Sequence, residues 1–166
     1  MIADIFMGIG TAGFRQESDT AIYEMQIDNA MALNEKLPPI KGIYYFSYAC
    51  DATILADDGT RSLDPELGGG MYKVSGARLC TYEGVTPSGY VIDEKWQAND
   101  GLVNTYSALV PIGAPSVDYN ADSVTTGIWN VMPVMRGNHS TLQGGMTKAL
   151  NGRIFFVDLL SMINSL

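Results

Sequence analysis

Two segments rich in aromatic and aliphatic residues, GIYYFSYA at 42–49 and IWNVMPVM at 128–135, constrain the fold of this chain most. Each is bounded by turn residues and has the length of a buried strand. Pro133 has no amide hydrogen to donate, so we expect it near a strand end or at a sheet edge. Two strands so far apart in the sequence, combined with helices and long crossings, indicate an α/β layer architecture.

Helices are expected before and after these strands. Asp28 is a candidate N-cap for a helix over residues 29–37, which Pro38 and Pro39 would stop. Just before it, residues 23–27 (YEMQI) alternate weakly and suggest a short extended piece. The C-terminal RIFFVDLLSMINSL predicts an amphipathic helix that packs on the core. Its apolar positions are Phe155, Phe156, Leu159, Leu160, Met162, Ile163 and Leu166.

The stretch from residue 50 to residue 100 is broken by prolines, aspartates and a run of three glycines, residues 68–70. So many irregular residues inside one domain indicate a functional loop region. The glycine run lacks the lysine and serine or threonine of a phosphate-binding loop, so we predict no such site. Trp96 and Trp129 are interpreted as packing aromatics rather than substrate contacts.

Composition and charge narrow the classes of function. A chain of 166 residues with 46% hydrophobic residues can bury the core of one domain, residues 1–166. The net charge of −8 argues against nucleic acids and anionic membrane surfaces as partners. Uncharged lipids and esters stay compatible with it. No run approaches the ~20 apolar residues of a membrane span, and the first residues lack the features of a signal peptide.

Two cysteines, Cys50 and Cys80, fit no metal-ligand spacing. A disulfide between them in an exported protein and two buried free thiols are both compatible with the sequence.

His139 is the one histidine of the chain, and it stands four residues after the second strand segment. In open α/β sheets that place, beyond the carboxyl end of a strand, is where ligands bind. A histidine becomes an effective general base when a carboxylate holds its ring. Asp100, in the turn-forming sequence Asn99-Asp100-Gly101, is the best candidate carboxylate, although such a sequence also forms plain tight turns.

Longer stretches of the chain resemble the C-terminal half of bacterial triacylglycerol lipases, the thermophilic-bacillus and staphylococcal family with the α/β-hydrolase fold. WQANDGLVNT is similar to the family's N-D-G-x-V-N-T motif, and GIWNVMPVMRGNH to its G-x-W-N-x-M segment followed by D-H. SDTAIYEMQIDNAMALN, GIYYFSYA and PELGGGM match further family segments in the right order, so the resemblance runs from about residue 18 to residue 166.

The resemblance implies the C-terminal part of an α/β-hydrolase sheet, with long loops and a closing helix. It implies ester hydrolysis in which Asp100 orients His139 and His139 activates a serine. No serine of this sequence has glycine at both the second position before and the second position after it. We therefore expect a C-terminal lipase piece that lacks the nucleophile-bearing half and does not hydrolyse esters by itself.

The resemblance also implies a calcium site beside His139, to which Gly68 would contribute. Thr141 and Gln143 stand where carboxylates are needed, and Asn138 stands where the family has aspartate. We therefore expect no required cofactor, and one histidine cannot build the family's zinc site.

Three interpretations of the chain stay open at this point: part of a secreted lipase, a non-catalytic lipase-like module or relic, or a subunit that complements a separate serine-bearing half. A hydrolase sheet cut in two would expose a strand edge and apolar surface. We therefore expect the isolated chain to self-associate or to depend on a partner.

Overall fold

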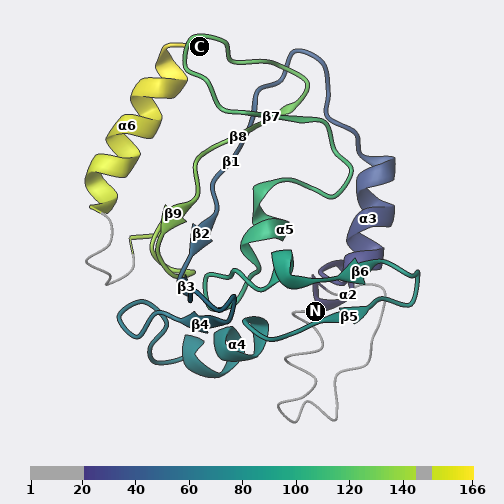
Figure 1. Ribbon diagram of the computed structural model, residues 1–166. Helices are drawn as coiled ribbons and strands as arrows, with labels where there is room; N and C mark the ends of the chain where they lie inside the picture. The colour runs from purple at the N-terminus through teal and green to yellow at the C-terminus, as the bar shows by residue number, and fades with distance from the viewer. Residues whose placement is uncertain (1–20, 145–150) are drawn as a thin grey trace.

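The central sheet of the computed structural model contains three parallel strands in the order β1-β8-β7. The structure describes residues 21–144 and 151–166. Strand β8 (Trp129–Val131) lies between β1 (Tyr45–Ser47) and β7 (Ser116–Asp118), and Asn130 is in register with Phe46 on one side and Val117 on the other. Among the described residues β1 pairs in this sheet with β8 alone, so β1 is an edge strand (Figure 1).

The two chain segments of β1 and β8 continue as a second parallel pair, β2 (Cys50–Asp51) with β9 (Met135–Arg136). The predicted strand segments are therefore in the right place, but the strands are short: residues 42–49 contain β1 and end just before β2, and residues 128–135 contain β8 and the first residue of β9. Pro133 lies at the interruption, where it has no N–H to donate. Backbone bonds from Met132 to Ser47 and from Met135 to Ala49 keep the two segments side by side across it.

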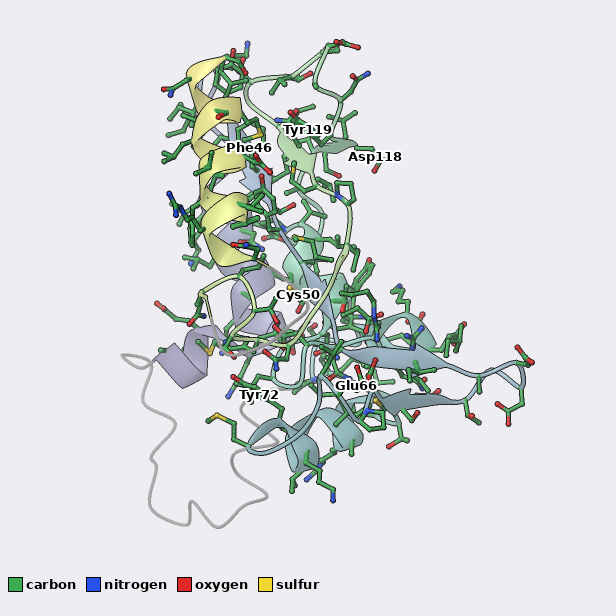
Figure 2. The ribbon with its side chains drawn as sticks, turned by 90° about the vertical axis from the view of Figure 1, so that its left-hand side faces the viewer. Phe46, Cys50, Glu66, Tyr72, Asp118 and Tyr119 are labelled. Carbon is green, nitrogen blue, oxygen red and sulfur yellow. The ribbon has the colours of Figure 1, made fainter. Side chains whose placement is uncertain are left out.

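The region from residue 50 to residue 100 contains more regular structure than the predicted loops. Strands β3 (Thr53–Leu55) and β4 (Arg61–Leu63) form one antiparallel hairpin, and β5 (Gly84–Val85) and β6 (Val91–Ile92) form another. Helix α4 (Tyr72–Leu79) lies between the hairpins, and the 3-10 turn η1 (Glu94–Trp96) precedes the short helix α5 (Thr105–Leu109). In Figure 2 the β3–β4 hairpin projects away from the rest of the molecule.

The N-terminal helices correct two sequence predictions. Residues 23–27 are not extended, because α2 (Ala21–Glu24) is helical and α3 (Ile27–Lys36) begins directly after it. The N-cap of α3 is Gln26, and Asp28 lies in the first turn. The Asp28 carboxylate instead accepts hydrogen bonds from the backbone N–H and the hydroxyl of Ser88, at 2.9 and 2.7 Å. The helix does end before Pro38, as predicted.

The buried core lies beside the sheet, where α3, α4, η1 and the β5–β6 hairpin meet. Leu79 and Trp96 are almost fully buried, and Ile27 and Ile92 complete the cluster. The Trp96 ring packs against Tyr90 and Tyr106, with ring centroids 5.8 and 5.0 Å apart. Trp96 is thus the packing aromatic that the sequence predicted.

The C-terminal helix α6 (Gly152–Asn164) is present as predicted, and the Asn151 side chain caps it by accepting from the Ile154 N–H. Its packing differs from the prediction, because no residue of α6 is buried. One face contacts Tyr48, whose ring lies 5.3 Å from that of Phe155. A second apolar face is exposed. This outer face of α6 comprises Ile154, Phe156, Val157, Leu160 and Ile163.

Candidate active site

Asp100 is held in a tight turn between η1 and α5. Its Oδ1 accepts hydrogen bonds from the backbone N–H groups of Leu102 and Val103, at 2.9 and 2.7 Å. Gly101 has a φ of +99°, and a Cβ there would lie 2.6 Å from the Cβ of Tyr72, so glycine is required on both counts. The turn leaves Oδ2 as the carboxylate oxygen that faces away from its own backbone.

Buried polar contacts fix this turn, residues 99–104, against its neighbours; we call it the acid turn. Asn99 has no exposed surface, and its Oδ1 accepts from Gly101 N–H while its Nδ2 donates to the carbonyls of Gln97 and Gly76. The Ser75 hydroxyl of α4 donates to the Gly101 carbonyl at 2.5 Å. A buried polar group without a hydrogen-bond partner costs free energy, so these bonds stabilise the conformation of the turn.

His139 is placed next to Asp100 by two separate hydrogen bonds. Its ring Nδ1 lies 2.9 Å from Asp100 Oδ2, and its backbone N–H donates to the Asp100 carbonyl at 2.8 Å. The Asp100 side chain is 12% exposed and the His139 side chain 36%. With Nδ1 held by the carboxylate, Nε2 is the ring nitrogen that is left to exchange a proton with a reactant. The structure therefore brings together the two residues that the sequence singled out.

The loop that carries His139 is hydrogen-bonded to the neighbouring chain segment from its first residue after β9. Gly137 N–H donates to the Asp51 carbonyl at 3.1 Å, which extends the β2–β9 pairing toward the site. A Cβ on Gly137 would lie 2.7 Å from the Thr141 Oγ1, so a larger residue would displace the loop. Close approach of the backbone to Thr141 is thus one reason for glycine before Asn138-His139.

The residues beside His139 do not fit the calcium site that the resemblance implies. The Leu67 carbonyl accepts the Asn138 Nδ2 at 2.9 Å, and the Thr141 Oγ1 accepts the Asn138 backbone N–H. A cation in this place would compete with those N–H donors for the same oxygen atoms. Residues 21–144 and 151–166 contain no group of three or more His, Cys, Asp and Glu side chains that could hold a metal ion.

The cysteines of the described region are free thiols and do not supply a nucleophile. Cys50 and Cys80 are both buried and unbonded to each other. Burial, and secondarily the charges of Asp100 and Asp51, raise the pKa of the Cys50 thiol to about 11. Burial likewise raises the pKa of Cys80. Both side chains are thus protonated near neutral pH, whereas the reactive form of cysteine is the thiolate.

A polar network beside the site escaped the sequence analysis. Arg136 of β9 pairs with Asp64 at 2.7 Å and also donates to the Thr53 carbonyl. Arg61 donates to the Thr53 hydroxyl at 2.8 Å, and that hydroxyl donates to Asp51. The partners of Arg136 are far apart from it in sequence, so no local pattern could have indicated them. The network ties the β3–β4 hairpin to the strand that leads into the His139 loop.

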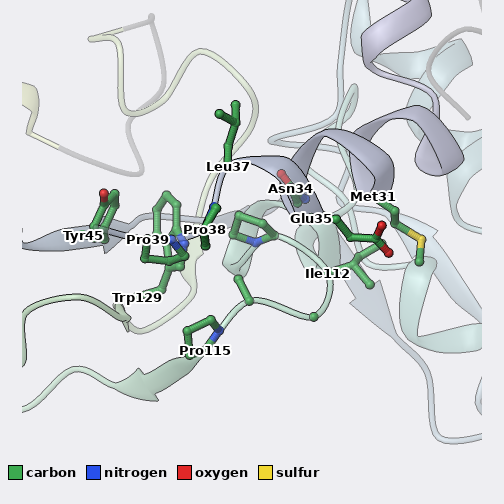
Figure 3. Close-up of a pocket in the computed structure, with 13 residues that line it drawn as sticks. Met31, Asn34, Glu35, Leu37, Pro38, Pro39, Tyr45, Ile112, Pro115 and Trp129 are labelled. Carbon is green, nitrogen blue, oxygen red and sulfur yellow. The ribbon is translucent and has the colours of Figure 1, made fainter. Parts of the chain in front are cut away.

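A separate cavity of about 500 Å³ lies between the end of α3 and the segment after α5. Figure 3 shows Pro38, Pro39, Tyr45 and Trp129 at one side of it. Trp129 is half-buried and stacks near Tyr45, with ring centroids 5.4 Å apart. Trp129 therefore packs as predicted and also lines a cavity, which the sequence did not indicate. Neither Asp100 nor His139 lines this space.

We compared the sequence and the structure with those of known proteins. No family model matches the sequence. A lipase of Staphylococcus hyicus is 30% identical over 151 residues, which cover 89% of this chain and 22% of that protein. The crystal structure of a Staphylococcus hyicus lipase matches with a TM-score of 0.71 and 25% identity, over 90% of this chain and 37% of that one.

Two further solved structures agree. Lipase 1 of Pelosinus fermentans matches with a TM-score of 0.65 and 28% identity, over 81% of this chain and 36% of that one. EstA from Clostridium botulinum, at 24% identity, shares the fold with a TM-score of 0.81, over 98% of this chain and 38% of that one.

The mixed helices and strands and these neighbours define an α/β-hydrolase-like polypeptide, so the predicted α/β class is confirmed. Within that class the chain is homologous to bacterial lipases over most of its length, and the resemblance predicted from the motifs is confirmed. The chain spans 22% of the curated relative and no more than 38% of these solved chains. In the described part of the chain, no helix is long and apolar enough to cross a membrane.

Proposed function

We propose that this chain supplies the acid and the base of a Ser-His-Asp triad in a carboxylester hydrolase of the triacylglycerol lipase type. The observation that carries the proposal is the 2.9 Å contact between His139 Nδ1 and Asp100 Oδ2, in a loop beyond a parallel strand. Homology to lipases supports the same reaction class. Residues 1–166 would then be a C-terminal α/β-hydrolase domain, whose sheet continues in the part that carries the serine.

In this reaction His139 Nε2 takes the proton of a serine hydroxyl while the serine oxygen bonds to the acyl carbon of an ester. The protonated ring then gives that proton to the leaving alcohol. Water attacks the resulting acyl-serine by the same route and regenerates the serine. Asp100 keeps Nδ1 protonated and stabilises the ring when it carries a positive charge. The sequence contains no G-x-S-x-G segment, so the serine and the oxyanion donors come from elsewhere.

The resemblance to lipases supports the remaining parts of the proposal. The substrate is an uncharged lipid or ester, the reaction requires no metal or cofactor, and the enzyme acts outside the cell. A second candidate is that of a subunit that complements a separate serine-bearing half. The unpaired edge of β1 and the exposed outer face of α6 fit both candidates, because a serine-bearing half would cover them whether it is fused to this chain or separate.

Hydrolysis of short- and long-chain p-nitrophenyl esters tests the proposal in three forms of the protein. The first is the chain alone, the second is the chain mixed with a serine-bearing lipase half, and the third is a fusion of that half to this chain. We expect no activity from the chain alone and activity from the fusion. His139→Ala and Asp100→Asn should each lower the activity of the fusion by about 10³-fold or more.

The matched control is Asn120→Ala, which removes an exposed side chain that accepts a hydrogen bond from the Asp122 N–H in a surface turn and should leave the rate unchanged. Activity of the fusion that survives His139→Ala would refute the assignment of the base. Activity of the chain alone that disappears in His139→Ala would place the nucleophile within these 166 residues. Activity of the mixture would select the complementing subunit over the single polypeptide.

A further inference from the structure

The Asn138 side chain connects two loops that are distant in sequence. Its Nδ2 donates to the Leu67 carbonyl at 2.9 Å, and its Oδ1 accepts from the backbone N–H and hydroxyl of Ser140 at 3.1 and 3.0 Å. The Thr141 hydroxyl also lies 3.3 Å from Oδ1. Asn138 is only 7% exposed, so these bonds are made where water competes little.

The Leu67 side of this link is itself fixed. Leu67 and Gly68 both donate their backbone N–H groups to the Asp64 carbonyl, at 3.2 and 2.8 Å, which makes residues 64–68 a closed turn. The backbone N–H of Asp64 donates to the Ala52 carbonyl at 2.8 Å, and its carboxylate pairs with Arg136. The turn is therefore held to the β3–β4 region and to β9 by hydrogen bonds and an ion pair.

On the other side, Asn138 stands between two backbone anchors of the histidine loop. Gly137 before it donates to the Asp51 carbonyl, and His139 after it donates to the Asp100 carbonyl. The Asn138 side chain adds a third point of attachment in another direction. Three anchors on consecutive residues fix the backbone from which the His139 ring projects.

An amide is the side chain that this place requires. Its nitrogen donates to the Leu67 carbonyl while its oxygen accepts from Ser140 and Thr141. A carboxylate of the same size can only accept, so one of its oxygens would face the Leu67 carbonyl oxygen and would need a cation between them. The amide makes that bridge with its own hydrogen.

We propose that Asn138 is a positioning residue that holds the His139 loop on the turn at residues 64–68 without a metal ion. This inference rests on the proposed role of His139 as the base. It deepens that proposal by explaining how the His139 loop is held in place next to Asp100 although its residues do not fit the implied calcium site.

The test uses nuclear magnetic resonance on the full ¹⁵N-labelled chain. One readout is the hydrogen-exchange rate of the His139 backbone amide, and the other is the share of its neutral ring that carries the proton on Nδ1. Asn138→Ala should speed the exchange about tenfold, because one bridging bond to a buried carbonyl is lost, and should lower the Nδ1–H share. Ser140→Ala, which removes one hydroxyl from the same loop but leaves the bridge to Leu67, should stay near the wild-type values.

Asn138→Asp in the presence of EDTA should behave like Asn138→Ala. In the wild-type chain neither EDTA nor added CaCl₂ should change either readout. Loss of the Nδ1–H signal on EDTA treatment, or wild-type values in Asn138→Ala, would overturn the inference. The EDTA measurement needs no variant, so it is decisive even where a variant does not fold. Both readouts are spectroscopic, so they are independent of whether the fusion hydrolyses esters.

Discussion

The acid turn and the outer face of α6 are opposite in character. In the acid turn, Asn99 and Asn104 are fully or almost fully buried, and their side chains are paired with backbone groups. On the outer face of α6, Ile154 and Leu160 expose 57% and 59% of their surface. The polar side chains of the acid turn are thus paired within the described chain, whereas the apolar side chains of this face are exposed to solvent. We infer that the acid–base pair is formed within this chain and does not wait for a partner.

The largest test of this contrast is Asn99→Ala in the acid turn. It removes the side-chain partner of the Gln97 carbonyl and of the Gly101 N–H in a buried place, while the Gly76 carbonyl keeps the Cys80 N–H, so we expect the free energy of unfolding to fall by about 2–3 kcal/mol. Asn120→Ala is the control, because Asn120 makes a similar bond to a backbone N–H two residues on but is exposed. Urea denaturation measures both. Equal losses in the two variants would show that the acid turn is no more rigid than a surface turn.

The second test concerns the outer face of α6. We expect the wild-type chain to self-associate at micromolar concentration, and the double variant Leu160→Glu, Ile163→Glu to raise the dissociation constant about tenfold or more, because it places charge on the contact surface. Analytical ultracentrifugation measures the constant. Ala121→Glu, Ser123→Glu adds the same charge at exposed positions outside α6 and serves as control. A wild-type chain that stays monomeric would contradict the expectation.

The smallest expected effect is a dependence of stability on alkaline pH through Cys50. Burial raises the pKa of this thiol to about 11 in the folded chain from an ordinary value of 9.0, so the folded state keeps a proton that the unfolded state has lost. Stability from this group is therefore complete below pH 9 and declines as pH rises toward 11. At pH 9.5 the unfolding equilibrium constant should increase about fourfold. Cys50→Ala should remove this part of the slope in urea titrations, and an unchanged slope would contradict the assignment.

The sequence predicted the pair but not what surrounds it. Asp100 and His139 could be found because an acid in a tight turn and a histidine after a strand are local patterns, strengthened by the lipase-like motifs. Asn138 could not be recognised as an anchor, since Leu67, which it bonds, is remote in the sequence. The same applies to Arg136 and Asp64.

The fold was predictable to a similar degree. Aromatic segments indicated where β1 and β8 lie, and Pro38 indicated where α3 ends. The N-cap prediction for Asp28 was wrong because a tertiary partner, Ser88, takes the carboxylate that a local pattern assigned to the helix end. The hairpins β3–β4 and β5–β6 have strands of two or three residues, too short to show a period.

The central position of β8 has a consequence for how the chain folds. Its two neighbours, β1 and β7, are both earlier in the sequence, and the pairing of Tyr45 with Trp129 closes a loop that contains both hairpins, α4 and α5. Closing so long a loop lowers the entropy of the chain before stabilising contacts between the strands have formed. Non-local parallel pairing is slow for that reason. His139 follows β8 and β9 directly, so we expect its contact with Asp100 to become stable once these strands have paired. The appearance of that contact in a refolding experiment would then report closure of the sheet.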